Sequence, residues 1–250
     1  MIRFAVLALA AIALRAQTVD ELIAKNLAAR GGVERLEQAR SERLRGRITM
    51  DGVEGTLRLE RLRVRDTREI RTEVTVEGRS YVHGFDGVLA WSQTGTDGEG
   101  WLEARRLHGD DVDTLREDAE FDDGLLDVRE RGATVRYDGR AAMDGKQLYK
   151  VMLRLKDGNV FYCFLDPDSW LETRRTGGRV IGGREALIDW TFGDYRESGG
   201  MQAPFRVESV SRDTGERQLI QVERIEWNLG LGEERFQPAR AGSGVDRASR

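Results

Sequence analysis

The chain has 250 residues, of which 34% are charged and 39% are hydrophobic, and its formal net charge at pH 7 is −4. This composition is typical of a soluble folded protein and excludes an intrinsically disordered chain. Basic and acidic residues alternate, as in Arg68, Glu69, Arg71 and Glu73. Because no patch of a single sign forms, the sequence argues against nucleic-acid binding.

The first residues have the pattern of a secretory signal peptide. Arg3 gives a positive start, residues 4–14 are mostly apolar and small, and Ala16 offers a small residue near a cleavage point. The apolar run is too short to cross a bilayer, which takes ~20 residues. A buried N-terminal helix is the alternative interpretation. We predict that residues 1–16 are removed and that the mature chain is exported.

Two short helices are expected next. Thr18 and Glu21 have the spacing of a capping box, and apolar residues such as Leu22 and Leu27 follow at helical spacing. A pair of glycines ends this helix, and residues 33–39 can form a second one. Both helices are amphipathic, so we expect their apolar faces to pack on the sheet that follows.

Alternation of apolar and polar residues, the pattern of a strand, begins at Leu44. After Leu59 the alternation changes phase, since Leu62 and Val64 are apolar where Arg61 and Arg63 would be expected to be. A shift of one residue turns every side chain to the other face, so the sequence predicts a bulge or bend near Glu60-Arg61.

An interruption over residues 92–127 separates two groups of strands. It contains a glycine-rich loop and then a helical pattern over residues 110–120 with acidic residues in its first turn. Asp-Gly pairs at positions 51, 86, 97, 123, 138, 144 and 157 indicate antiparallel strands joined by short turns. The expected strands cover residues 44–50, 53–64, 70–76, 81–85, 88–91, 134–143, 146–155, 160–165, 170–176, 184–195, 203–210 and 218–227.

The stretch 146–165 reads as a β-hairpin around Asp157-Gly158. Its first arm alternates, with one apolar and one largely charged face, whereas its second arm is apolar throughout. We therefore expect both faces of the second arm to be covered. The single cysteine, Cys163, lies in this arm, which excludes a disulfide framework and indicates a buried, unreactive thiol.

The sequence resembles the outer-membrane lipoprotein-sorting proteins, which belong to the wider lipoprotein-carrier (LolA-like) superfamily. The stretches that carry the resemblance are Thr18 to Leu36, Phe85-Asp86-Gly87 through Trp91, Phe121 to Glu172, Phe192-Gly193-Asp194-Tyr195 with Pro204-Phe205, and Val222 to Gln237.

The resemblance implies a mainly β (α+β) fold. Its core is a strongly curved, unclosed antiparallel β-barrel of roughly ten or eleven strands, with helices covering the concave face. One such domain would occupy residues 17–237, and residues 238–250, which are small and polar, are expected to be a disordered tail. The resemblance also implies a periplasmic monomer that binds lipid or lipoprotein acyl chains. Possible partners are an inner-membrane donor and an outer-membrane acceptor.

Large apolar residues of the expected strands are the candidates for lining a ligand cavity, although each of them could equally be ordinary core. Burial of an acyl chain of about 16 carbons offers on the order of 10 kcal/mol before the costs of binding. The candidates are Leu57, Leu59, Val74, Val76, Tyr81, Phe85, Trp91, Leu153, Phe161, Cys163, Trp190 and Phe192.

Two other functions stay open: an interaction or scaffold module with a filled core, and a hydrolase. The two histidines, His83 and His108, are not in a metal-binding spacing. The acidic residues between 110 and 123 lack the order of a calcium loop, although a weak cation or partner patch remains an alternative there. We therefore expect no catalytic residue, no metal and no cofactor.

Overall fold

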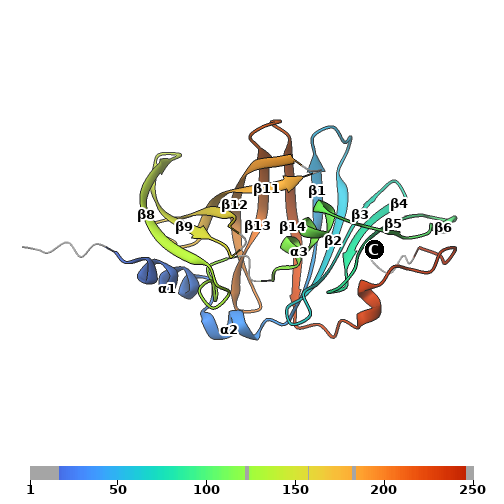
Figure 1. Cartoon of the computed structure of the whole chain (residues 1–250), viewed down its shortest axis with the longest axis horizontal. Coiled ribbons are helices and arrows are strands. Elements are labelled where there is room, and N and C mark those ends of the chain that lie inside the picture. Colours follow the sequence, from blue (N-terminus) through green and yellow to red (C-terminus); the bar gives the residue numbers. More distant parts are fainter. Residues whose placement is uncertain (1–16, 122–123, 157, 182–183, 246–250) are drawn as a thin grey trace, which may run out of the picture.

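A computed structural model describes residues 17–121, 124–156, 158–181 and 184–245. The predicted signal peptide lies outside this part of the chain. The described part is mainly β, with three short α-helices and one 3-10 helix (Figure 1). None of its helices is long and apolar enough to cross a membrane. The helices are α1 (Val19–Ala29), α2 (Val33–Gln38), α3 (Asp110–Ala119) and η1 (Glu233–Phe236).

The strands form one unclosed antiparallel sheet in the order β6-β5-β4-β3-β2-β1-β14-β13-β12-β11-β10-β9-β8, and β7 pairs with β5. They are β1 (Ser41–Met50), β2 (Leu57–Val64), β3 (Glu69–Val76), β4 (Arg79–Phe85), β5 (Ala90–Thr96), β6 (Gly100–Trp101), β7 (Arg105–Arg106), β8 (Thr134–Met143), β9 (Lys146–Arg154), β10 (Val160–Leu165), β11 (Glu172–Ile181), β12 (Arg184–Ser198), β13 (Met201–Ser211) and β14 (Arg217–Trp227).

The expected ten or eleven strands are too few, because the sheet has 14. The short strands β6 and β7 lie in the segment that the sequence predicted to be a loop. Each of them has only two residues, which are too few to show a period of two. The sequence therefore carried no signal for them.

The capping box and the central hairpin are confirmed. The backbone N–H of Glu21 donates to Oγ1 of Thr18 over 3.2 Å, and the N–H of Thr18 donates to Oε2 of Glu21 over 3.1 Å. In the hairpin, β9 pairs with β10 from Tyr149 opposite Leu165 to Arg154 opposite Val160. Both features follow from short-range rules, so the sequence alone was sufficient.

The predicted bulge at Glu60-Arg61 is wrong. The pairing of β1 with β2 runs without a shift from Ser41 opposite Val64 to Ile48 opposite Leu57. The change of phase instead reflects charged residues placed on the buried face. Arg61 and Arg63 both donate to the buried carboxylate of Glu42 on β1, at 2.9 and 3.0 Å.

Burial raises the pKa of the Glu42 carboxyl, but the charges of Arg63 and Arg61 and their hydrogen bonds outweigh this effect. The net result is a pKa below the usual value. The register shift in this region lies on the other side of β1, between Arg45 and Gly46, where β1 pairs with β14. A Cβ on Gly46 would lie 2.4 Å from the carbonyl oxygen of Gln221, so the close approach of the two strands needs glycine.

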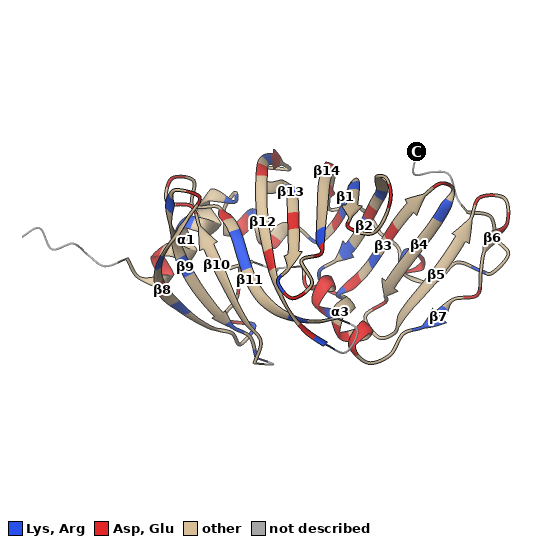
Figure 2. Cartoon of the chain, turned by 90° about the horizontal axis from the view of Figure 1, so that it is seen from above, with Lys and Arg blue, Asp and Glu red and all other residues tan. Residues whose placement is uncertain are grey.

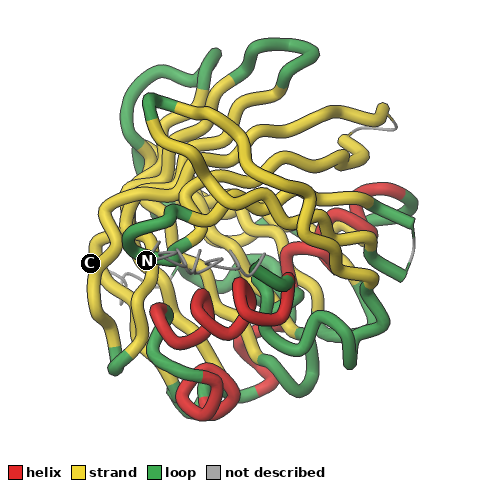
Figure 3. Tube along the Cα trace, turned by 90° about the vertical axis from the view of Figure 1, so that its left-hand side faces the viewer, coloured by secondary structure: helices red, strands yellow, loops and turns green. Residues whose placement is uncertain are grey.

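The sheet has two faces, and the α-helices lie together on one side of it (Figure 3). We call this side the helix face. Leu22 of α1 and Leu115 of α3 pack on it, against residues such as Leu153 and Phe85. Because side chains alternate along a strand, the residues between these point to the opposite side, which we call the outer face.

The C-terminal segment packs on the outer face. The indole N–H of Trp91 donates to the carbonyl oxygen of Phe236 over 2.9 Å, and the backbone N–H of Ala239 donates to Oε1 of Gln93 over 2.9 Å. The backbone N–H of Gly242 bonds to β6 over 2.8 Å. This part of the predicted disordered tail is therefore bonded to the sheet, and residues 246–250 lie outside the described part.

Candidate ligand-binding surface

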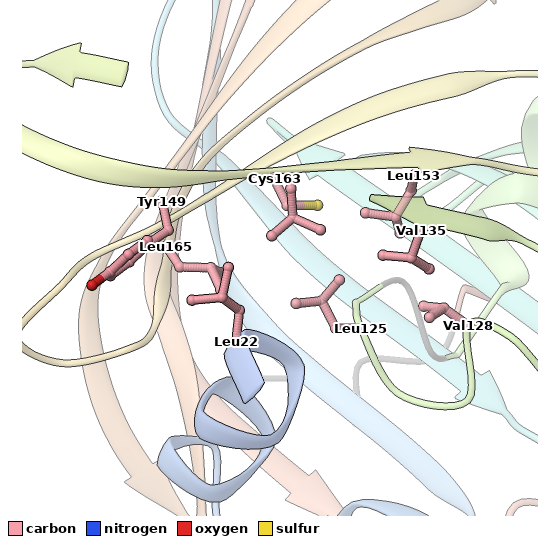
Figure 4. Packing of buried hydrophobic residues seen from close by; sticks show 9 residues of the cluster. Leu22, Leu125, Val128, Val135, Tyr149, Leu153, Cys163 and Leu165 are labelled. Carbon is pink, nitrogen blue, oxygen red and sulfur yellow. The ribbon is translucent and has the colours of Figure 1, made fainter. Parts of the chain in front are cut away.

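One end of the helix face is a closed apolar cluster beneath α1. Strands β8, β9 and β10 contribute its sheet side, and Leu22 and the segment after α3 cover it (Figure 4). Leu153 is only 4% exposed there. The buried members of the cluster are Leu22, Leu125, Val128, Val135, Tyr149, Val151, Leu153, Cys163 and Leu165.

Cys163 belongs to this closed cluster. Burial raises the pKa of its thiol well above the usual value, and the negative charge of Glu172 acts in the same direction. The thiolate is the form that attacks an electrophile, so a buried thiol with a raised pKa is a poor nucleophile. The geometry therefore supports the predicted unreactive cysteine.

The other end of the helix face is covered by α3. Leu115 and Ala119 of the helix pack on Ile70, Phe85 and Ala90 of the sheet. His83 lies on the same face of β4 as Phe85, since the two are two residues apart in the strand. Partial burial lowers the pKa of His83, as does the charge of Arg105, while Asp111 and Asp118 oppose the shift.

Between these ends, apolar side chains form a continuous row across the strands. Phe192 on β12 pairs with Val207 on β13, Val207 with Ile220 on β14, and Ile220 with Ile48 on β1. Ile48 pairs in turn with Leu57 on β2. We call Phe192, Val207, Ile220, Ile48 and Leu57 the apolar row.

The apolar row is not evenly covered. Leu57 is 2% exposed and Ile48 is also buried, within a cluster that includes Leu59 and Phe205. Phe192, Val207 and Ile220, by contrast, are only half-buried. The row therefore has a filled floor at the β1 and β2 end and an apolar surface that solvent can reach on β12, β13 and β14.

Aromatic rings extend this surface toward β10. The rings of Phe161 and Trp190 lie 6.3 Å apart between centroids. Phe161 pairs with Gly177 on β11, and a Cβ there would lie 2.2 Å from the ring of Phe161. The ring can thus lie across β11 only because residue 177 is glycine.

An ion pair stands at the aromatic end of the row, and the sequence analysis missed it. The guanidinium of Arg175 donates two hydrogen bonds to the carboxylate of Glu172, over 2.9 and 2.8 Å. It also lies 5.4 Å from the ring centroid of Phe192. The hydroxyl of Tyr195 donates to the carbonyl oxygen of Glu172 over 2.5 Å. Charged and apolar residues do not alternate around Glu172 and Arg175 in β11, so no local pattern indicated this pair.

Helix α3 contacts β3, β4 and β5, and it also contacts β11 on the far side of the intervening strands. Nη2 of Arg179 on β11 donates to Oδ1 of Asp118 over 2.6 Å and to the carbonyl oxygen of Thr114 over 3.2 Å. The hydroxyl of Thr114 donates to the carbonyl oxygen of Val180 over 3.3 Å. Figure 2 shows that much of the ribbon of α3 is coloured for acidic residues. The helix therefore links two distant parts of one sheet.

The structure places all the sequence-predicted residues except Trp91 on the helix face. Leu153 and Cys163 lie in the cluster beneath α1, with Phe161 at its edge, and Phe85 lies beneath α3. Leu57 and Leu59 are buried in the cluster that includes Phe205, which we call the central cluster, and Val74 and Val76 pack against it. Trp190 and Phe192 lie on β12, opposite Ser209 and Val207 of β13.

Two predicted residues are not brought into this group. Tyr81 is on the helix face of β4 but is 43% exposed. Trp91 pairs with Gly84 and packs on the outer face with Val82 and Trp101. The apolar run before Trp91 does not alternate, so the sequence held no indication of the face on which this ring lies.

Within the described residues, no group of three histidine, cysteine, aspartate or glutamate side chains is arranged to hold a metal ion. Several charged groups on the helix face are paired with one another, as in Glu42 with Arg63 and Glu172 with Arg175. Such pairs fix side chains in place. The arrangement is suited to contact with an apolar molecule on the row.

No family model and no curated protein match the sequence. Solved structures do match. A DUF1329 family protein from Desulfovibrio piger has 14% identity and a TM-score of 0.56, over 89% of this chain and 98% of that one. A LolA superfamily protein from Nitrosomonas europaea has 13% identity and a TM-score of 0.56, over 89% and 99%.

A third similar structure is a putative outer membrane lipoprotein-sorting protein domain from Vibrio parahaemolyticus. It has 10% identity and a TM-score of 0.54, over 86% of this chain and 94% of that one. At these identities the likeness concerns the fold. The chain therefore has a LolA-like fold, as the resemblance in its sequence implied.

Proposed function

We propose that the chain is an exported, non-enzymatic carrier that binds a hydrophobic ligand, a lipid or the acyl chains of a lipoprotein, on the helix face. The observation that carries this proposal is the apolar row. Its residues on β12, β13 and β14 are half-buried, and they adjoin the buried residues Ile48 and Leu57 on one side. A contiguous apolar surface open to solvent is a common mark of a binding site.

The row has the dimensions that an acyl chain needs. Neighbouring strands lie 4.7–4.9 Å apart, so the four spacings from β12 to β2 cover about 19 Å. Each methylene removed from water contributes about 0.8 kcal/mol. The side chains of Leu57 and Ile48 are already buried by their neighbours. We therefore place the ligand on the solvent-accessible surface of the row and not in a tunnel through the core.

In this proposal the helix face is the concave face of the curved sheet, and α3 controls access to it. The contact between Arg179 and the segment 114–118 links the helix to β11. Release of this link would let α3 move while it stays packed on β3, β4 and β5. Ligand entry and exit would then require little change in the sheet.

We further propose that the carrier works in the periplasm as a monomer, after removal of residues 1–16. The signal-like N-terminus supports export. The similar structure from Vibrio parahaemolyticus is named as a putative outer membrane lipoprotein-sorting domain, which supports transfer between an inner-membrane donor and an outer-membrane acceptor.

The test is extraction of the purified full-length protein with organic solvent, followed by mass spectrometry of the extract. Wild type should contain acyl lipid. Val207→Glu places a charge on the half-buried part of the row and should reduce the lipid about tenfold or more. Val210→Glu is the matched control, since it makes the same change in the same strand on the outer face.

The close packing of the buried residues at the β1 and β2 end of the row favours a second candidate, the interaction module with a filled core. The burial of Leu57, Leu59 and Phe205 is what such a module would show. It predicts no extractable lipid in wild type and no binding of added fatty acid. Equal lipid content in both valine variants would also move the binding site away from the row.

A further inference from the structure

A cleft of about 430 Å³ lies at one end of the helix face, between α2 and the ends of β12, β13 and β14. This volume is within the range of small-molecule sites. The cleft is lined by Arg35, Gln38, Ser198, Gly199, Met201, Ile225, Trp227 and Asn228.

The cleft is held open by bonds at both ends of α2. Before the helix, the carbonyl oxygen of Arg30 accepts the backbone N–H of Gln202 over 2.9 Å. After the helix, the backbone N–H of Arg40 donates to Oδ1 of Asn228 over 2.8 Å. Between these two anchor points α2 bridges the ends of the strands, and the space beneath it is preformed.

The chemistry of the cleft has two parts. Met201, Ile225 and Trp227 contribute the apolar side chains of its lining, and the indole N–H of Trp227 donates to Oγ of Ser198 over 3.2 Å. Its rim carries Arg35. A Cβ on Gly200 would lie 3.2 Å from Cδ and Nε of Arg35, so this side chain extends along the turn between β12 and β13.

The charge among the residues that line the cleft is positive only. The lining contains one arginine and no aspartate or glutamate, although acidic residues outnumber Lys and Arg in the chain by 44 to 40. The nearby Glu197 accepts the backbone N–H of Gly200 over 2.6 Å. The side-chain amide of Gln38 donates to Oε1 of Glu34 over 3.4 Å, so the guanidinium of Arg35 is the charged donor among the lining residues. A guanidinium in this setting suits a carboxylate or a phosphate.

Strand β14 connects the cleft to the apolar row. Its helix-face residues are Trp227 and Ile225 in the cleft, then Val222, then Ile220 in the row. Ile225, Val222 and Ile220 all belong to the central cluster. At about 3.3 Å per residue, the distance from Ile225 to Ile220 is about 17 Å. A molecule with a charged head in the cleft could therefore place its chain on the row.

We propose that the cleft binds the anionic headgroup of an amphiphile, a carboxylate or a phosphate, with Arg35 as its counter-ion and the acyl chain directed along β14. This inference rests on the proposed carrier function, and it adds the chemical class of the ligand. The donor set selects anionic over neutral amphiphiles of the same chain length.

The test compares dodecanoate, dodecyl phosphate and dodecanol by calorimetric titration of the full chain, below their aggregation concentrations. Wild type should bind the two anions roughly tenfold more tightly than the alcohol, the effect expected of one charge-assisted pair. Arg35→Gln should bring the anions to the level of the alcohol and leave the alcohol unchanged. The matched control is Arg58→Gln, an exposed arginine of β2 on the outer face.

The outcomes separate this inference from the carrier proposal. Equal affinity of wild type for the anions and the alcohol would overturn the headgroup site and leave the carrier intact, as would an equal loss in both arginine variants. Binding of inorganic phosphate as tightly as dodecyl phosphate would show an anion site that ignores the acyl chain, which also overturns the inference. No binding of any amphiphile would overturn the carrier proposal itself.

Discussion

The contact between Arg179 and α3 should control how readily the helix leaves β11. Arg179→Gln removes the charge and the hydrogen bonds to Asp118 and to the carbonyl oxygen of Thr114. The side chains of Arg179 and Asp118 are 21% and 44% exposed. The pair therefore lies between an exposed ion pair, worth about 0.2–1 kcal/mol, and a hydrogen bond to a charged group, worth about 1.5–3 kcal/mol.

We expect a loss of about 1–2 kcal/mol in the free energy of opening at α3, which is roughly a 5- to 30-fold rise in the open population. Hydrogen exchange of the amides in residues 110–119 measures this population. Leu115 and Ala119 keep their contacts with the sheet, so global stability should fall by no more than the local loss. Binding of a fatty acid should become faster in the variant.

The matched control is Arg206→Gln, which breaks an ion pair with Glu208 within one strand, away from α3. It should leave exchange in α3 unchanged. Unchanged exchange in Arg179→Gln would refute the link between α3 and β11. Faster exchange throughout the sheet in that variant would show that Arg179 stabilises the whole fold and has no special effect on access.

Two further predictions concern the packing of the sheet. Glu42→Gln should cost about 3–5 kcal/mol by leaving Arg63 buried without its carboxylate. Because the folded-state pKa of Glu42 is lowered, its contribution is present above the unfolded pKa of about 4.3 and is lost as pH falls through the folded value. The free energy of unfolding, measured with urea at several pH values, should therefore fall less steeply with decreasing pH in the variant than in wild type. The same pH dependence in both proteins would contradict this. Gly177→Ala should cost about 1–3 kcal/mol through collision with Phe161, whereas Gly178→Ala, whose added Cβ meets nothing within 4 Å, should not destabilise. Thermal unfolding of the two variants checks this, and equal melting temperatures would contradict the packing of the ring.

Local rules were sufficient for much of the fold. The capping box of α1 and the β9–β10 hairpin depend on residues close in sequence, so their patterns were readable. The shared face of Leu57, Val74 and Val76 was also recognisable, because the alternation along each strand assigns these residues to one side.

Features that depend on contacts between distant parts of the chain could not be predicted from the sequence. The phase change in β2 was interpreted as a bulge, because nothing local indicated that Arg63 would find Glu42 across the β1–β2 pair. Trp91 was assigned to the ligand surface, and only the packing of Phe236 and the segment after it shows why its face is buried. The link from Arg179 to α3 likewise joins residues some sixty positions apart.

The most direct test of the account is a photoreactive fatty acid that is crosslinked to the protein and mapped by peptide mass spectrometry. The account predicts adducts on the helix-face residues Phe192, Val207 and Ile220, and loss of these adducts when excess unlabelled fatty acid is present. Adducts on the outer face, or adducts that excess fatty acid does not displace, would contradict a ligand on the apolar row.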